Sequence, residues 1–223
     1  MSNAIIVSYD GTPNDDDALA LGRMLARGGS PLALAYVRHS QEFDPGREEL
    51  AAHDANRRLE QGAAWLGDST IPRHVVIHAS TWEGLAQLAG SLDASIIVFG
   101  SDYRTPPGRV SPGTSAQHLL EGGPVAIAVA AAGIRSVSEP ALATIAVGDD
   151  EPDAAALQTA ESLAEKLGAV VSHDPDAQVD LLVIGARADT RAGRIQLSGL
   201  GRSRLASARG AVLVVPAGVP LAL

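Results

Sequence analysis

The residues best suited to chemistry in this chain are glycines, hydroxyls and arginines between positions 100 and 115. Gly113, Thr114 and Ser115 stand where a helix is predicted to begin, and the first amides of a helix have no partner within it. These amides, the two hydroxyls and the positive end of the helix dipole suit a phosphate group. Arg104 and Arg109 precede them and would add positive charge. The pattern indicates anion binding.

A second group of candidate residues follows the first predicted strand. Asp10, Gly11 and Thr12 come directly after an apolar run, and ligands of open parallel sheets collect at the carboxyl ends of the strands. The segments beginning at Val37 and Gly100 are expected at the same edge. Three acids, residues 15–17, already occupy the positive end of the first helix. We therefore expect an anion at Gly113 rather than at Thr12, and we interpret the acids as satisfying the helix dipole instead of binding a metal.

These candidate residues need a scaffold that brings strand ends together. Short apolar runs predict buried strands, and the amphipathic segments between them predict helices. The alternation indicates right-handed crossovers and a five-stranded parallel sheet. The predicted strands are 5–9, 32–37, 73–78, 95–99 and 125–129, and the predicted helices are 13–27, 48–66, 82–92 and 113–120.

The second half of the chain repeats the first imperfectly. Residues 143–152 align with 4–13, residues 181–185 with 96–100, and residues 193–195 with 108–110. A repeat of this kind predicts one fold built twice. The helix–strand–helix expected between residues 172 and 180 is missing. We predict a complete domain at 1–132, a linker at 133–141 and a truncated repeat at 142–223, with strands at 144–147, 169–172, 181–184 and 212–215 and helices at 153–167 and 199–208.

The same residues resemble the universal stress protein family. Its members have a strand ending in Asp-Gly-Ser/Thr and, after the fourth strand, a loop of the form G-x2-G-x9-G-[ST]. Residues 10–12 match the first element, and Gly100 and Gly113 match the outer glycines at the family spacing of thirteen. Tyr103 replaces the middle glycine. The resemblance implies an α/β fold of two universal-stress-type (adenine-nucleotide α-hydrolase-like) parallel-sheet sandwiches, the second shortened.

The resemblance also implies a ligand, ATP or AMP, with or without magnesium. Asp10 would contact the adenine or ribose, backbone at Val37 would bind the adenine edge, and Gly100 would let ribose and phosphates approach closely. If Tyr103 closes the site, no nucleotide is expected. The implied cofactor-binding residues, to which charge and position add the two arginines, are Asp10, Gly11, Thr12, Val37, Gly100, Arg104, Arg109, Gly113, Thr114 and Ser115.

The second copy departs from this pattern. Asp149 is retained, but Asp150 replaces the following glycine, and Leu200 is aligned with Thr114. We expect this copy to be a packing partner without a nucleotide. In the family the last strands of two units pair antiparallel across a dimer, so residues 125–129 are expected to pair with 212–215 in an internal pseudo-dimer. Association of two chains into a homodimer stays open.

Composition restricts the remaining functions. Aromatic residues make up 3% of the chain and hydrophobic residues 46%, which is typical of parallel sheets covered by alanine-rich helices. A net charge of −9 argues against nucleic acid as a partner. No apolar run would span a membrane, and no secretory signal is expected. The lack of cysteine suits a cytoplasmic protein.

We therefore expect an adenine-nucleotide-binding universal stress protein that acts as a sensor or regulatory module in a stress response. No catalytic residues or metal site are expected, and turnover is limited to slow ATP hydrolysis at most. Two alternatives remain. One is an interaction scaffold of the same fold without nucleotide, and the other is an ATP-using enzyme of the wider adenine-nucleotide group.

Overall fold

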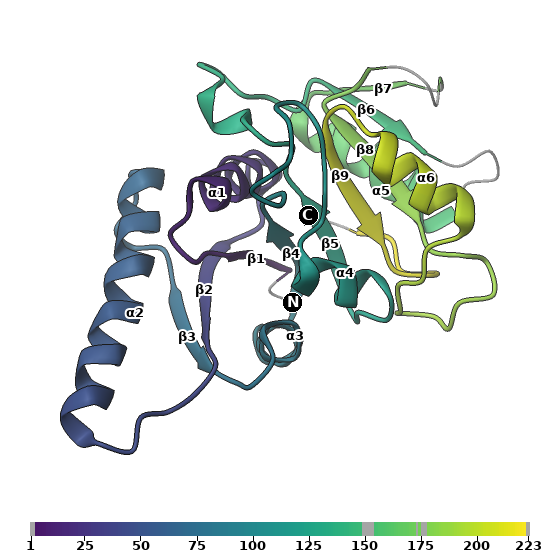
Figure 1. The fold of residues 1–223 in the computed structure, drawn as a ribbon. Helices are drawn as coiled ribbons and strands as arrows, with labels where there is room; N and C mark the ends of the chain where they lie inside the picture. The colour runs from purple at the N-terminus through teal and green to yellow at the C-terminus, as the bar shows by residue number, and fades with distance from the viewer. Residues whose placement is uncertain (1–2, 149–153, 173, 175–177, 222–223) are drawn as a thin grey trace.

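The protein forms a three-layer α/β structure around one mixed sheet (Figure 1). The computed structural model describes residues 3–148, 154–172, 174 and 178–221. The strands are β1 Ala4–Ser8, β2 Leu32–Arg38, β3 Arg73–Ile77, β4 Ala94–Phe99, β5 Ala126–Val129, β6 Thr144–Val147, β7 Val170–Ser172, β8 Leu181–Gly185 and β9 Ala211–Val215. The helices are α1 Pro13–Ala26, α2 Pro45–Leu66, α3 Thr81–Leu92, α4 Thr114–Leu120, α5 Ala154–Leu167, α6 Gly199–Ser207 and the 3-10 helix η1 Ile134–Ser136.

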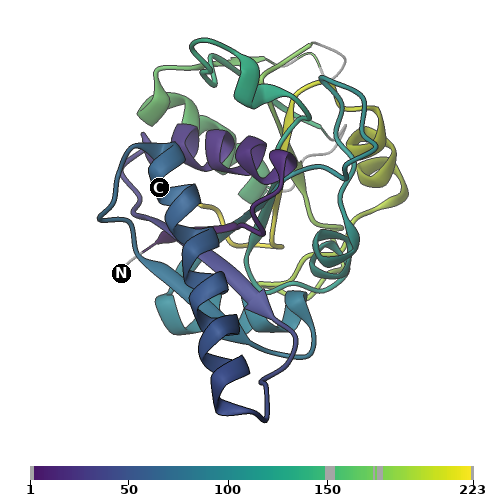
Figure 2. The same ribbon diagram turned by 60° about the vertical axis from the view of Figure 1, so that its left-hand side comes forward.

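The N-terminal half, β1 to β5, is a parallel sheet in the order β3-β2-β1-β4-β5. β1 lies between β2 and β4 and consists entirely of buried residues. α1 begins with Pro13 after Thr12, where a proline costs no helical hydrogen bond. α1 and α2 cover one face of this sheet, and α3 and α4 cover the other (Figure 2). The predicted five-stranded parallel sheet is confirmed.

The C-terminal half, β6 to β9, is also parallel, in the order β7-β6-β8-β9. β6 leads through α5 to β7, and β8 leads through α6 to β9. Within the described residues, no helix or further strand lies between β7 and β8. Among the described residues, the C-terminal half therefore has fewer helices and strands than the N-terminal half, and that it is a shortened copy stays a prediction. The predicted start of its helix, residue 153, and the acids Asp149 and Asp150 lie outside the described residues.

The two halves join through β5 and β9, which pair antiparallel. Ala128 lies opposite Leu213, and Val129 lies opposite Val212. This confirms the strand pairing expected between residues 125–129 and 212–215. The pairing covers two sheet edges that would otherwise expose unpaired backbone groups.

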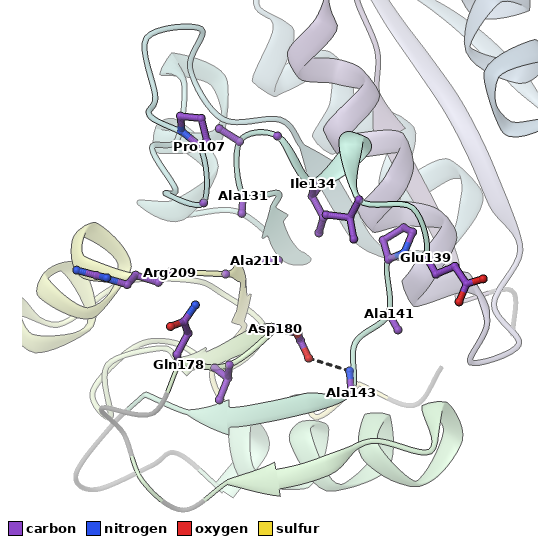
Figure 3. A pocket seen from close by; sticks show the side chains of 17 residues that line it. Pro107, Ala131, Ile134, Glu139, Ala141, Ala143, Gln178, Asp180, Arg209 and Ala211 are labelled. Atoms are coloured by element: carbon purple, nitrogen blue, oxygen red, sulfur yellow. Dashed lines mark hydrogen bonds between the residues drawn. The ribbon is translucent and has the colours of Figure 1, made fainter.

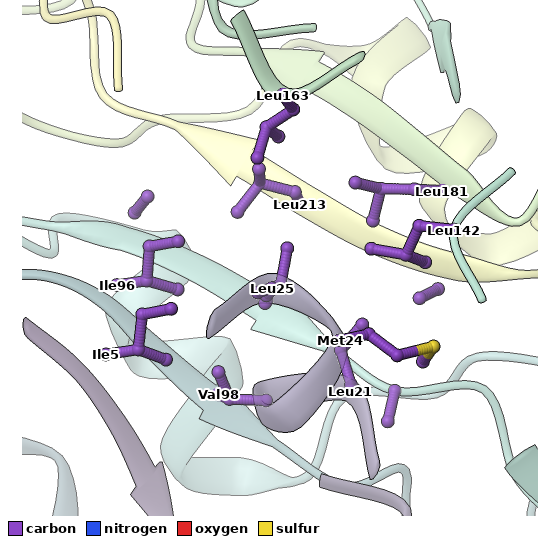
Figure 4. Packing of buried hydrophobic residues seen from close by; sticks show 14 of the residues in the cluster. Ile5, Leu21, Met24, Leu25, Ile96, Val98, Leu142, Leu163, Leu181 and Leu213 are labelled. Atoms are coloured by element: carbon purple, nitrogen blue, oxygen red, sulfur yellow. The ribbon is translucent and has the colours of Figure 1, made fainter. Parts of the chain in front are cut away.

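A continuous hydrophobic core crosses the junction. On one face of the sheet, Leu21 and Leu25 of α1 belong to the same buried cluster as Leu163 of α5 and Leu213 of β9 (Figure 4). On the other face, α3, α4 and α6 contribute to a second cluster that also spans both halves. Because both clusters are shared, each half contributes to burying the other.

The loops that follow β4 and β8 have the same backbone hydrogen bonds. The amide of Gly108 donates to Ala132, and the equivalent amide of Gly193 donates to Ala217. Both glycines have a φ of +74°. Ser198 follows Gly193 at the same distance as Gly113 follows Gly108, so Ser198 takes the position of Gly113. This corrects the sequence alignment, which placed Leu200 against Thr114.

The segment between the halves is held by α1. Asp17 is fully buried, and its carboxylate accepts hydrogen bonds from the amides of Gly133 (2.9 Å) and Arg135 (2.8 Å). The guanidinium of Arg135 donates a third, at 2.6 Å. The predicted linker is thus anchored at its start. None of the helices in the described residues combines the length and apolarity that crossing a membrane requires.

Candidate functional site

The candidate site lies at the carboxyl edge of the N-terminal half, beside β1. Here the chain order reverses, because β2 and β3 lie on one side of β1 and β4 and β5 lie on the other. Loops leaving β1 and β4 therefore diverge at this edge, which is where open α/β sheets bind ligands. The structure brings residues 10–12, Val37 and Gly100 to this edge, as expected.

The loop after β1 is organised by Asp15. Its carboxylate accepts hydrogen bonds from the Asp10 amide (3.1 Å), the Thr12 amide (2.9 Å) and the Thr12 hydroxyl (2.8 Å). Gly11 turns the chain with a φ of +84°, which favours glycine. This role of Asp15 was not predicted from the sequence. The signal was available, because an acid three residues after a threonine suits a reciprocal helix cap.

The Asp10 carboxylate is exposed and makes no hydrogen bond among the described residues, whereas its backbone carbonyl accepts one from Arg58 (2.9 Å). Desolvation by the surrounding protein raises the pKa of Asp10, and the negative charge of Asp15 raises it further. Desolvation also raises the pKa of Asp15. Two acids whose pKa values are raised by desolvation therefore lie at the open end of β1.

Val37 presents its backbone to this edge. The amide of Tyr9 donates to Ala35 of β2, and the amide of His78 donates to Arg38. Backbone groups of successive residues in a strand point to opposite sides. The amide and carbonyl of Val37 therefore point toward β1, one step beyond the bond made by Tyr9. The Val37 side chain itself is buried in the core.

Gly100 has a packing role in the fold. A Cβ atom at this position would lie 2.1 Å from the carbonyl oxygen of Asn14, in the first turn of α1. The Asn14 side chain also donates to the carbonyl of Ser101, at 2.8 Å. The close approach that requires a glycine here is made by α1. That Gly100 also makes room for ribose and phosphates stays a prediction.

Gly113 is the N-cap of α4, and its surroundings are open. A Cβ atom there would meet no atom within 4 Å. Thr114 is exposed, and Ser115 is half-buried. Among the described residues, the hydroxyls of both make no hydrogen bond, and the first amides of α4 have no partner within the helix. Packing therefore gives no reason for a glycine at this position, in contrast to Gly100.

The two arginines of the preceding loop turn toward the C-terminal half. The guanidinium of Arg109 donates to the carbonyls of Ser207 (3.1 Å) and Ala206 (3.3 Å), at the end of α6. Arg104 lies over the ring of Tyr103, 4.9 Å from its centroid. The Arg109 side chain thus caps α6, and its role at a phosphate group stays a prediction. Tyr103 is 73% exposed, so its ring does not fill a buried site.

Two further arrangements near this edge are side-chain contacts. Trp82 of α3 stacks on His118 of α4, with ring centroids 5.6 Å apart. The Tyr9 hydroxyl donates to Asp16 at 3.3 Å, and burial together with the charge of Asp16 raises the pKa of Tyr9 to about 12. Each of the three acids at 15–17 thus has its own hydrogen-bond partners within the protein. Among the described residues, no group of three histidines or acids is arranged to hold a metal ion.

A large cavity lies elsewhere, between the segment after β5 and the C-terminal half (Figure 3). Its volume is about 760 Å³, and its walls are mostly alanine, glycine and proline. Asp180 lines it, but one oxygen of that carboxylate already accepts bonds from the amides of Ala143 and Thr144 and from the Thr144 hydroxyl. The sequence predicted no site there, and the wall chemistry assigns none.

Comparison with solved structures identifies proteins of the same fold. The α/β fold with its mostly parallel sheet is shared by a universal stress protein from Archaeoglobus fulgidus DSM 4304, with a TM-score of 0.72 at 14% identity. That match covers 98% of this chain and 100% of the other. A functionally unknown protein from Pseudomonas aeruginosa PAO1 matches with a TM-score of 0.61 at 15% identity, over 96% of this chain and 92% of the other. These likenesses show the fold.

The family follows from the sequence model of the universal stress protein family, which matches residues 1–130. The chain belongs to the universal stress protein family. No curated protein matches it.

Proposed function

We propose that the N-terminal half binds an adenine nucleotide, ATP or AMP, at the carboxyl edge beside β1. The phosphates would lie at the start of α4, on the amides and hydroxyls of Gly113, Thr114 and Ser115. Asp10 would bind the ribose or adenine, and the free backbone of Val37 would bind the adenine edge. Bound nucleotide would make the protein a sensor or regulatory module in a stress response, without efficient turnover.

The observation that carries this proposal is a contrast between α4 and α6. At the start of α6, the Ser198 hydroxyl accepts a hydrogen bond from the amide of Gly201 at 2.9 Å. The positive end of α6 is thus capped by its own chain. Gly113 occupies the equivalent position in α4 and has no side chain. The amides of α4 are therefore left for an external acceptor, and a phosphate oxygen is a suitable one.

We also propose that the C-terminal half is a shortened copy of the N-terminal half, within the domain limits 1–132 and 142–223. The equivalent loop hydrogen bonds and the equivalent strand order support this origin. In this arrangement the chain is an internal pseudo-dimer, and the C-terminal half is a packing partner. Its capped α6 and its missing β3 equivalent both argue against a second nucleotide.

The test is calorimetric titration of the whole chain with ATP and with AMP, each with magnesium. We compare wild type with Gly113→Val, whose side chain would occupy the open space at the start of α4. Gly122→Val is the matched control, because a Cβ at Gly122 also meets no atom within 4 Å but lies beyond the other end of α4. Binding that is lost in Gly113→Val and kept in Gly122→Val would support the proposal.

The rival functions predict different results. Wild-type protein that releases no heat and gains no thermal stability with either nucleotide would favour an interaction scaffold. Release of ADP or pyrophosphate on adding metabolites would favour an ATP-using enzyme. If wild type and Gly113→Val bind the nucleotide with equal affinity, the phosphates do not bind at the start of α4.

A further inference from the structure

A second concave site lies between the loop after β4 and helix α6. It has a volume of about 410 Å³, within the range of small-molecule sites. One wall comes from the loop, residues 102–112, and the other from one face of α6, formed by Arg202, Leu205 and Ala206. We call it the loop–α6 groove. Its lining does not include Gly113, Thr114 or Ser115, so it is distinct from the proposed nucleotide site.

The groove is positively charged although the chain carries a net charge of −9. Three arginines line it, Arg104, Arg109 and Arg202, against a single acid, Asp102. The end of α6 would repel an anion through its helix dipole. Arg109 offsets that effect, because its guanidinium donates to the last carbonyls of this helix. Arg104 and Arg202 therefore provide the positive charge that a ligand in the groove would contact.

Arg104 and Arg202 have donors to spare. Arg104 is exposed and rests on the Tyr103 ring, and it forms no ion pair with any other described residue. Arg202 donates one hydrogen bond, to the carbonyl of Leu197 at 2.9 Å, and has no carboxylate partner there either. A guanidinium carries five N–H donors in a fixed fork that matches carboxylate and phosphate oxygens. Two such forks at one groove provide an anion-binding pair.

The equivalent loop after β8 provides an internal comparison. The residue in the position of Arg104 there is Asp189, and it forms an ion pair with Arg187. Gln117 of α4 takes the position of Arg202. At the two positions equivalent to Arg104 and Arg202, that side thus has an acid and a neutral amide. The free arginine pair is specific to the loop–α6 groove and does not follow from the scaffold.

The floor of the groove is apolar. Val110 is 5% exposed and Leu205 is 7% exposed, and both line the groove. An inorganic ion would leave this surface wet, whereas an organic anion would cover it. From the arginine pair and this floor, we propose that the loop–α6 groove binds a small organic anion, a phosphomonoester or carboxylate, held by Arg104 and Arg202. The proposal is independent of nucleotide binding at α4.

The probe is phenyl phosphate, titrated calorimetrically at pH 8 and constant ionic strength, with inorganic phosphate as the comparison. Wild type is compared with the double variant Arg104→Gln/Arg202→Gln. The matched control, Arg47→Gln/Arg191→Gln, removes the same charge from exposed positions outside the groove. All four substituted side chains are exposed, so unchanged melting temperatures are expected.

We expect phenyl phosphate to bind wild type more tightly than inorganic phosphate does. Its affinity should fall about tenfold or more in the groove variant, since two charge-assisted interactions are lost, and stay within about twofold in the control. Gly113→Val should bind it like wild type. No binding to wild type, equal losses in both double variants, or loss only in Gly113→Val would each overturn the proposal. If wild type binds phenyl phosphate and inorganic phosphate with equal affinity, the apolar floor does not contribute to binding.

Discussion

The guanidinium of Arg109 donates to the carbonyl of Ser207 at 3.1 Å, so a loop of the N-terminal half caps a helix of the C-terminal half. The reverse contact is also present, because Arg194 donates to the carbonyl of Gly122 at 3.1 Å, just after α4. Each arginine follows the positive-φ glycine of its loop. Together with the β5–β9 pairing, these two contacts fix how the halves sit against each other.

The first prediction concerns these reciprocal caps. Arg109→Gln and Arg194→Gln should each lower the free energy of unfolding by about 0.5–1 kcal/mol, because each removes a charged donor from helix carbonyls in a partly exposed place. Urea denaturation measures the change. Arg191→Gln, an exposed arginine of the loop after β8, should have no measurable effect. If all three variants have the same stability, the caps contribute nothing to the junction.

The second prediction compares the effects on stability of substituting Gly100 and Gly113, the two outer glycines of the motif. Gly100→Ala should destabilise the fold by about 1–3 kcal/mol, since its Cβ would overlap the backbone of Asn14 and α1 would have to shift. Gly113→Ala meets open space and should cost no more than about 1 kcal/mol, the size of a lost N-cap preference. Thermal and urea unfolding give both values. Equal costs would contradict the packing role of Gly100.

Much of this fold could be predicted from the sequence because its signals are local. The buried strands read as short apolar runs, such as residues 5–7 and 96–98, and the glycines and prolines between them mark the turns. The antiparallel pairing of Ala128 with Leu213 followed from the family resemblance, since strand runs alone do not say which edges meet. The direct succession of β7 and β8 in the described residues was visible as a short spacing.

The site was less predictable, because it depends on contacts between distant segments. Spacing alone could not show that Gly100 packs on Asn14, or that Arg109 reaches Ser207 in the other half. A glycine required by a neighbouring helix and a glycine left free for a ligand look the same in sequence. The two cases are separated only by the three-dimensional surroundings, which are crowded at Gly100 and open at Gly113.

The third prediction tests the anchor of the segment between the halves. Asp17→Asn should lower the free energy of unfolding by about 3 kcal/mol, because it leaves Arg135 without its buried carboxylate and loses an acceptor for the amide of Gly133. Asp16→Asn is the control. It weakens the hydrogen bond from Tyr9 and removes a charge near Arg135, but leaves the buried carboxylate of Asp17 in place, so it should cost about 1 kcal/mol at most. Urea denaturation of both variants checks the difference, and equal costs would mean that the anchor is not stabilising.

The fourth prediction concerns Asp10, the acid at the end of β1. The pKa of Asp10 is raised in the fold, so the folded state holds that proton more tightly than the unfolded chain does. Stability is therefore lost as pH rises from the unfolded value through the folded one. Asp10→Asn should melt at a higher temperature than wild type at pH 7, and this difference should vanish near pH 3. A difference that does not change with pH would exclude the charge of Asp10 as its cause.

The same variant should bind nucleotide more weakly if Asp10 contacts the ligand, because the charged acceptor is gone. Higher stability with lower affinity is the expected combination for a residue kept for binding at a cost to the fold. Titration with ATP and AMP supplies the second half of the comparison. Unchanged affinity would leave Asp10 with only its backbone role in the turn.

The last prediction uses the difference between α4 and α6. Gly113→Ser would give α4 the residue that caps α6, and its hydroxyl should accept a hydrogen bond from an amide of the first turn, as that of Ser198 does from Gly201. Serine is a slightly better N-cap than glycine, so the fold should gain about 0.3 kcal/mol. The nucleotide would then compete with the new hydroxyl for the amides, and its affinity should fall about tenfold.

Stability and binding should thus move in opposite directions in Gly113→Ser, a result that a damaged fold cannot produce. Gly122→Ser, beyond the far end of α4, is the control and should leave nucleotide affinity unchanged. Thermal unfolding and calorimetric titration on the same preparations measure both quantities. A more stable Gly113→Ser with full affinity for ATP and AMP would show that the amides of α4 are not where the phosphates bind. The open N-cap would then be a feature of the helix alone.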